Sequence, residues 1–157
     1  MRALEETPDY AMASFENIFV TIWRQRTSLL ALEQLAKHLL ALAALQPAGL
    51  GIVIIVPANS PPPPNEVRAR LAAAISAAPQ VKASAVCFEG SGLRATIVRS
   101  VVAGLTILSR PSYPHRVFGT LEEGVGFINT QLNLVSAPTR QTSRIVGEIR
   151  AWRLALR

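Results

Sequence analysis

A short glycine loop is the most direct candidate for binding chemistry in this sequence. Gly90, Ser91 and Gly92 stand between an expected strand and an expected helix, and Arg94 follows them. Backbone N–H groups at the amino end of a helix can hold an anion, and an arginine adds positive charge. The spacing matches neither a dinucleotide-binding fingerprint nor a Walker loop, which needs a lysine. An anion site and a plain tight turn both remain open interpretations, and the turn is favoured.

Three more polar residues follow expected strands and extend this candidate site. Glu89 is the only acidic residue at the carboxyl end of an expected strand, while Asn59 and Ser60 follow a different strand. Open α/β sheets bind ligands at the carboxyl ends of their strands. The predicted ligand or anion site therefore comprises Asn59, Ser60, Glu89, Ser91, Gly92 and Arg94.

The residue types that catalysis or metal binding requires do not form a recognisable set. Cys87 is the single cysteine and lies inside an expected strand, which favours a buried, inert thiol. His38 and His115 are the two histidines, and they stand far apart in the sequence. A structural zinc site needs several cysteine or histidine ligands, and nucleophilic catalysis needs a base beside the nucleophile. We therefore expect no catalytic residues, no metal and no cofactor.

Composition indicates one globular domain. Of 157 residues, 50% are hydrophobic and 17% are charged, which excludes intrinsic disorder, and the single cysteine excludes a disulfide framework. No apolar run reaches the ~18 residues that span a bilayer, and the acidic N-terminus lacks the basic start of a signal peptide. We therefore expect a cytoplasmic protein.

The net charge of +6 belongs to the second half of the chain, since charges cancel up to Ala78. Arginine supplies nearly all of it, without interleaved aromatic residues, so we expect no specific nucleic-acid binding.

Apolar patterns predict strands that alternate with helices. Strands are expected at Asn17–Trp23, Leu50–Val56, Val81–Phe88 and His115–Phe118, and a further strand at Tyr10–Phe15 would pair with the first. Helices are expected at Leu29–Leu45, Glu66–Ala77, Leu93–Ser109 and Leu121–Leu132. This alternation predicts an α/β fold with a mixed, mostly parallel sheet of four to five strands and helices packed on it.

A separate amphipathic helix is expected after Pro138, within residues 138–157. Its apolar stripe is flanked by arginines, so it could dock on its own domain, on a second subunit or on an anionic membrane surface. Docking on protein is favoured, because so short a helix binds a membrane only marginally. The predicted partner-binding residues are Ile145, Ile149, Arg150, Trp152, Arg153 and Leu156.

The order of elements from Tyr10 to Leu132 resembles the STAS fold of the SpoIIAA-like anti-sigma-factor antagonists. The most specific part is Arg116-Val-Phe-Gly-Thr-Leu-Glu-Glu-Gly-Val-Gly-Phe-Ile128, in which a final strand leads into a helix that opens with paired glutamates. Phosphorylatable members carry an Asp-Ser pair where the second helix begins. Here Ser60 has no acidic residue before it and Pro61 after it, so we do not expect a kinase-operated switch.

The resemblance implies a STAS-like domain over residues 10–132, with residues 1–9 expected to be a flexible N-terminus. It also implies a non-enzymatic protein-interaction module that binds a protein partner or itself, for example as a homodimer. The alternative is a protein that binds a lipid or another small hydrophobic ligand, or an accessory enzyme, with a pocket at the strand ends.

Overall fold

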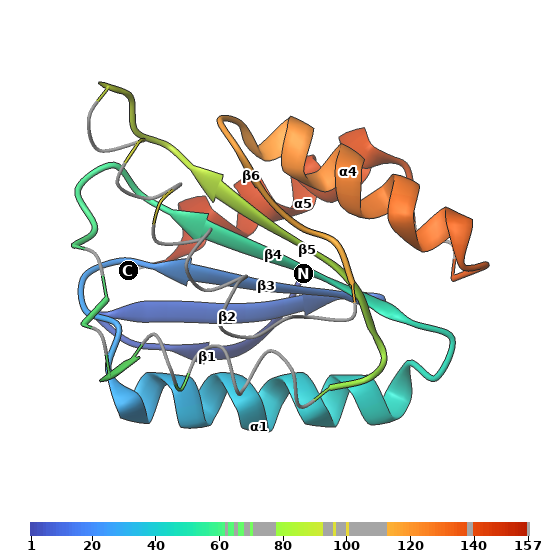
Figure 1. Ribbon diagram of the computed structural model, residues 1–157, viewed down its shortest axis with the longest axis horizontal. Helices are drawn as coiled ribbons and strands as arrows, with labels where there is room; N and C mark the ends of the chain where they lie inside the picture. Colours follow the sequence, from blue (N-terminus) through green and yellow to red (C-terminus); the bar gives the residue numbers. More distant parts are fainter. Residues whose placement is uncertain are drawn as a thin grey trace.

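A mixed sheet forms the centre of the computed structural model, and its strands lie side by side in the order of the chain (Figure 1). In the described part of the chain it has six strands: β1 (Arg2–Glu6), β2 (Tyr10–Phe15), β3 (Ile18–Trp23), β4 (Leu50–Val56), β5 (Val81–Phe88) and β6 (His115–Phe118). The first three strands pair antiparallel, and β3 to β6 pair parallel. The α/β class and the mostly parallel sheet are thereby confirmed.

The structure describes residues 1–61, 63–64, 66–67, 70, 78–92, 96, 100, 113–137 and 140–156. The helices expected at Glu66–Ala77 and Leu93–Ser109 lie largely outside these residues. Three helices are described in full, namely α1 (Leu29–Leu45), α4 (Leu121–Leu134) and α5 (Thr142–Ala155). None of the helices formed by described residues is long and apolar enough to cross a membrane.

The prediction of four to five strands is wrong, because β1 forms within the segment that was expected to be flexible. Thr7 makes the turn into β2, since its N–H donates to the Tyr10 carbonyl at 2.8 Å. The Tyr10 hydroxyl in turn donates to Glu5 Oε1 at 2.5 Å, and His38 Nε2 of α1 lies 2.9 Å from Glu5 Oε2. These tertiary contacts order a polar strand that has no apolar alternation of its own.

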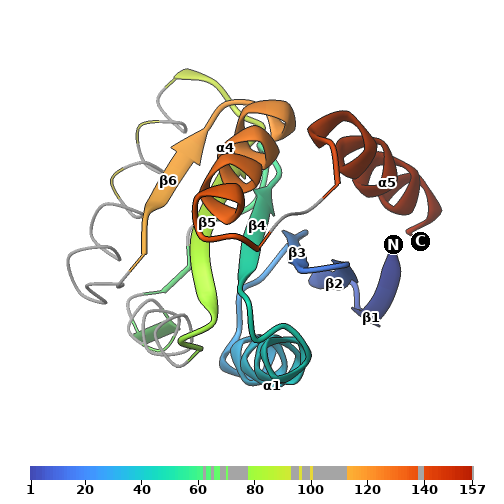
Figure 2. The same ribbon diagram turned by 90° about the vertical axis from the view of Figure 1, so that its right-hand side faces the viewer.

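Helices cover the two faces of the sheet separately: α1 lies on one side, and α4 and α5 lie on the other (Figure 2). Side chains of β3 alternate between the two sides, as a strand requires. Phe19 and Trp23 join the cluster under α1, whereas Val20 and Ile22 join the cluster under α4 and α5. The sheet is therefore buried on both faces, which explains the continuous apolar runs of β3 and β4.

Local signals set the ends of the helices. Ser28 is the N-cap of α1, and its hydroxyl accepts the Ala31 N–H at 3.2 Å. Thr120 does the same for α4, accepting the Glu123 N–H at 3.2 Å. Glu122 also lies in the first turn of α4, where the helix dipole favours negative charge.

The helix α5 docks on its own domain. Ile145, Val146, Ile149 and Trp152 are buried in the same cluster as the residues of β3 and α4. Asn129 of α4 fixes the start of α5, because its Nδ2 donates to Thr142 Oγ1 at 3.2 Å. Of the docking sites considered for the C-terminal helix, the structure shows the intramolecular one.

Candidate functional site

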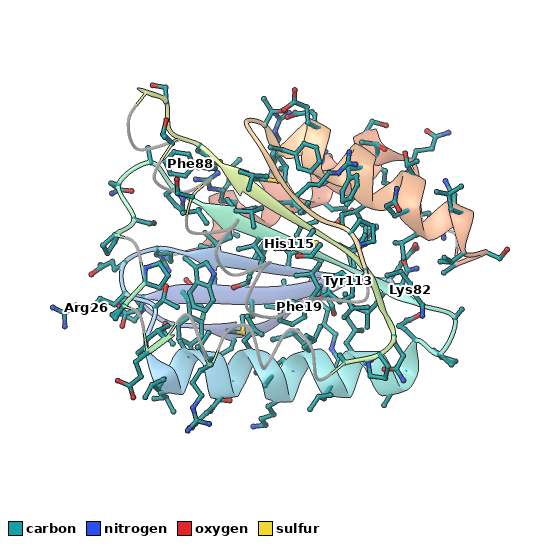
Figure 3. The ribbon with its side chains drawn as sticks, viewed as in Figure 1. Phe19, Arg26, Lys82, Phe88, Tyr113 and His115 are labelled. Atoms are coloured by element: carbon teal, nitrogen blue, oxygen red, sulfur yellow. The ribbon has the colours of Figure 1, made fainter. Side chains whose placement is uncertain are left out.

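The carboxyl ends of the parallel strands bring most of the predicted ligand-site residues to one edge of the sheet. The loops after β4 and β5 carry Asn59, Ser60, Glu89, Ser91 and Gly92. They leave the sheet together, because the Glu89 N–H donates to the Val56 carbonyl at 3.0 Å. Figure 3 labels Phe88, the last residue of β5, at this end of the sheet. Arg94, the sixth residue of the predicted site, lies outside the described residues.

Ser60 connects the loop after β4 to the end of β3. Its hydroxyl donates to the carbonyl oxygen of Trp23, the last residue of β3, at 2.6 Å. The side chain is half-buried, so the bond ties the loop after β4 to the end of the neighbouring strand. The Ser60 hydroxyl thus makes a structural contact within the chain.

Glu89 forms a bidentate ion pair with Arg153 of α5. Both terminal nitrogens of the guanidinium, Nη1 and Nη2, donate to the carboxylate, and the distance from Nη2 to Oε2 is 2.6 Å. The hydrogen bond to Glu89 raises the pKa of Arg153. Arg150, one turn earlier, pairs with Glu122 of α4. The structure therefore joins the predicted ligand site to the predicted partner-binding helix, and both arginines of the predicted partner-binding set pair with carboxylates of their own chain.

The backbone at Gly92 fits the turn interpretation of the glycine loop. Gly92 has a φ of +63°, and a Cβ placed there would have no neighbour within 4 Å. Glycine adopts this left-handed conformation without strain, so the residue type is explained by the turn itself. Ser91 and Asn59 are exposed. An anion at this loop stays a prediction.

Cys87 and His115 point to opposite faces of the sheet. Cys87 belongs to the cluster under α4 and α5, while His115 shares the other face with Val117. Burial, together with the negative charges of Glu89, Glu122 and Glu123, raises the pKa of the Cys87 thiol to about 12. The thiol is therefore protonated at neutral pH, and it has no histidine beside it to act as a base.

Sequence reasoning did not single out Ser84, which lies beside His115 across β5 and β6. Ser84 Oγ and His115 Nδ1 are both buried, and neither has a hydrogen-bond partner among the described residues. They continue a row that starts at Phe19 and Ile52 on the face of α1, and Figure 3 labels two of its members, Phe19 and His115. Burial lowers the pKa of His115, so its imidazole is neutral at pH 7. The available signal was a serine within the run Ala83–Phe88 of β5, whose other residues are apolar.

The predicted partner-binding residues divide into a buried set and an exposed set. Ile145, Ile149 and Trp152 are buried in their own domain, and Leu156 packs against the same cluster. Arg150 and Arg153 remain exposed. A partner that binds α5 would therefore meet the arginine face rather than the apolar stripe.

The outer face of α1 carries exposed apolar side chains instead. Leu30 is 62% exposed, Leu40 is 45% exposed and Leu45 is 68% exposed. Ala41 and Ala44, between the last two leucines, are exposed as well. The hydrophobic pattern of the sequence does not reveal this face, because leucine occupies both the buried and the exposed positions of the helix.

Comparisons with protein-family models, with curated proteins and with solved structures find no match to this chain. Within the described ranges, no group of three or more His, Cys, Asp or Glu side chains could hold a metal ion.

Proposed function

We propose that this chain is a non-enzymatic protein-interaction module. The observation that carries the proposal is the outer face of α1, where Leu30, Leu40 and Leu45 are exposed along one helix. Ala41 and Ala44 are exposed between Leu40 and Leu45 and make the last turns of this face apolar. Exposed apolar patches on a protein mark sites where another protein binds. The resemblance of residues 10–132 to the STAS fold supports the same function.

The state of the reactive side chains agrees with this proposal. Ser60 and Glu89 are used in contacts that hold loops and α5 in place. The Cys87 thiol is kept protonated by burial. These groups act on the structure of the chain itself, which is what a binding scaffold requires.

The test compares wild-type protein with the double variant Leu40→Glu/Leu45→Glu, in affinity capture and in sedimentation. Leu154→Glu on α5 is the matched control, because Leu154 is 89% exposed and lies on a different helix. We expect a complex, with a partner or with a second copy, that the α1 variant loses and the control keeps. Identical behaviour of all three proteins would refute the proposal.

The second candidate function is binding of a small apolar molecule with one polar group. The specific observation that favours it is the pair Ser84 Oγ and His115 Nδ1, which have no hydrogen-bond partner in the described part of the chain and lie in a row with Phe19 and Ile52. A buried polar atom without a partner costs about 1–3 kcal/mol, which a ligand hydroxyl or carboxyl group would recover. Native mass spectrometry of the purified protein would show an added small mass, reduced in Ser84→Ala. A spectrum of the bare chain alone would contradict it.

A further inference from the structure

We propose that the outer face of α1 binds the same face of a second copy of this chain, with the two helices antiparallel about a twofold axis. This inference rests on the proposed function and names its partner. The twofold arrangement uses the same surface on both copies and therefore closes as a dimer.

Five of the exposed residues of α1 follow the spacing of a helix-pairing seam. Leu30, Glu33, Lys37, Leu40 and Ala44 are all exposed, and they recur at alternating intervals of three and four residues. That heptad spacing puts them on one stripe that can face a partner helix along its length. The buried residues of α1, such as Leu32, Leu35 and Leu39, lie on the opposite side against the sheet. Figure 2 shows α1 at the margin of the molecule, with its outer side turned away from the sheet.

The charges on the stripe decide the orientation of the pair. Glu33 and Lys37 lie near its centre, and neither forms an ion pair with another described residue. Consider an antiparallel pair whose twofold axis crosses the helices at the level of residue 35. In this register Glu33 meets Lys37 of the second copy, and Lys37 meets its Glu33. The same register places Leu30 against Leu40 of the second copy, and Leu40 against its Leu30. A parallel pair would instead set like charges against each other, which is unfavourable.

The composition of the stripe also favours protein over lipid as the occupant. One acid and one base leave it without net charge, and it contains no aromatic residue. Helices that bind anionic membranes carry excess lysine or arginine and aromatic anchors. The α1 stripe has the neutral, self-complementary pattern that a second copy satisfies.

A charge-swap series measured by sedimentation equilibrium tests the inference. We expect the wild-type protein to dimerise, and each of Glu33→Lys and Lys37→Glu to raise the dimer dissociation constant about tenfold, because two ion pairs become two like-charge contacts. The double variant Glu33→Lys/Lys37→Glu restores opposite charges and should return the constant to near the wild-type value. Added salt should shrink these differences.

The outcomes separate this inference from the proposed function. If the protein forms a dimer but the charge swaps leave its dissociation constant unchanged, the proposed α1 pairing is wrong. A protein that stays monomeric, yet binds a different partner that Leu40→Glu/Leu45→Glu abolishes, overturns the second copy as partner and leaves the proposed function standing. A monomer in which that variant changes no interaction overturns both. Circular dichroism of every variant confirms that the fold is unchanged, since these positions are exposed.

Discussion

Single side chains hold together segments of this molecule that are far apart in sequence. Asn17, in the turn between β2 and β3, donates through Nδ2 to the Gly49 carbonyl at 3.3 Å and to the Ala137 carbonyl at 3.1 Å. It thereby joins the turn before β4 and the end of α4 to the sheet. The side chain is buried, so water cannot replace these bonds.

Replacing Asn17 by alanine should lower the free energy of unfolding by about 1–3 kcal/mol, because two buried carbonyl groups lose their donor. Urea denaturation measures the loss as a lower transition midpoint. Asn133→Ala is the control: Asn133 is exposed, and among the described residues its Nδ2 donates to Asn129 Oδ1, so we expect a change below about 0.5 kcal/mol. Equal midpoints for wild type and Asn17→Ala would contradict the role assigned to Asn17.

The phenol of Tyr10 should ionise only at strongly alkaline pH. Burial, together with the hydrogen bond to Glu5 and the negative charges of Glu5 and Asp9, raises its pKa to about 12. Burial also raises the pKa of Tyr113, the second tyrosine. Because the folded pKa of Tyr10 lies above the ordinary value of 10.0, its contribution to stability is complete below pH 10 and is lost as pH rises towards 12.

Ultraviolet titration measures this directly. The folded protein should show almost no tyrosinate at pH 10, whereas the urea-unfolded chain should be near half ionised. Tyr10→Phe should weaken the loss of stability above pH 10. A half-complete tyrosinate signal from folded protein at that pH would show that the hydroxyl is not held as described.

The Cys87 thiol should resist alkylation while the protein is folded. Its pKa of about 12 leaves almost no thiolate at neutral pH, and the side chain is buried. We expect iodoacetamide to modify the native protein at least about 100-fold more slowly than the urea-unfolded protein, where the thiol has its ordinary pKa. Similar rates in the two states would rule out this environment.

At the scale of elements, sequence patterns predicted most of the described helices and strands. The expected bounds of α1, β4, β5 and β6 agree with the structure, and α4 extends two residues beyond Leu132. Apolar runs and capping residues carry this information locally. The strand β1 was missed because Glu5 and Glu6 give it no apolar alternation, and contacts from β2 and α1 hold it in place.

The candidate site could be predicted from the sequence only in part, because local patterns do not carry contacts between distant segments. The order of the strands alone predicts that one edge of the sheet carries Asn59, Ser60 and Glu89. The ion pair between Glu89 and Arg153 does not, because 64 residues separate them and the contact depends on where α5 docks. The placement of Ser84 beside His115 depends likewise on the register of β5 and β6.

The close approach of α4 to the sheet depends on Gly124. A Cβ at this position would lie 2.3 Å from the Sγ of Cys87 in β5. We expect Gly124→Ala to destabilise the protein by about 1–3 kcal/mol through overpacking. Adding Cys87→Ala should recover much of the loss, because it removes the clashing atom; thermal or urea unfolding gives both values.

Gly147 provides the matched control on α5. A Cβ there would have no neighbour within 4 Å, and the position is inside the helix. Gly147→Ala should therefore stabilise the protein by about 1 kcal/mol through helix propensity alone. If both alanine variants changed stability in the same direction, the steric explanation for Gly124 would fail.

At the scale of the whole molecule, the last helix completes the second face of the sheet. Ile149 is fully buried, whereas Leu154 on the same helix is 89% exposed. Ile149→Ala should cost about 2–5 kcal/mol, as other buried truncations of this size do. Leu154→Ala should change stability by less than about 0.5 kcal/mol. Comparable effects of the two variants in urea denaturation would mean that α5 does not dock in solution.

The order of elements also has a consequence for how the chain folds while the ribosome synthesises it. The sheet ends with β6 at Phe118, but the helices that cover Ala11, Val20 and Ile22 come later in the chain. A nascent polypeptide therefore exposes this hydrophobic face of the sheet until α4 and α5 have left the exit tunnel. Such transiently bare surfaces are where aggregation competes with folding and where chaperones bind. A slow codon stretch before α5 would lengthen that vulnerable interval.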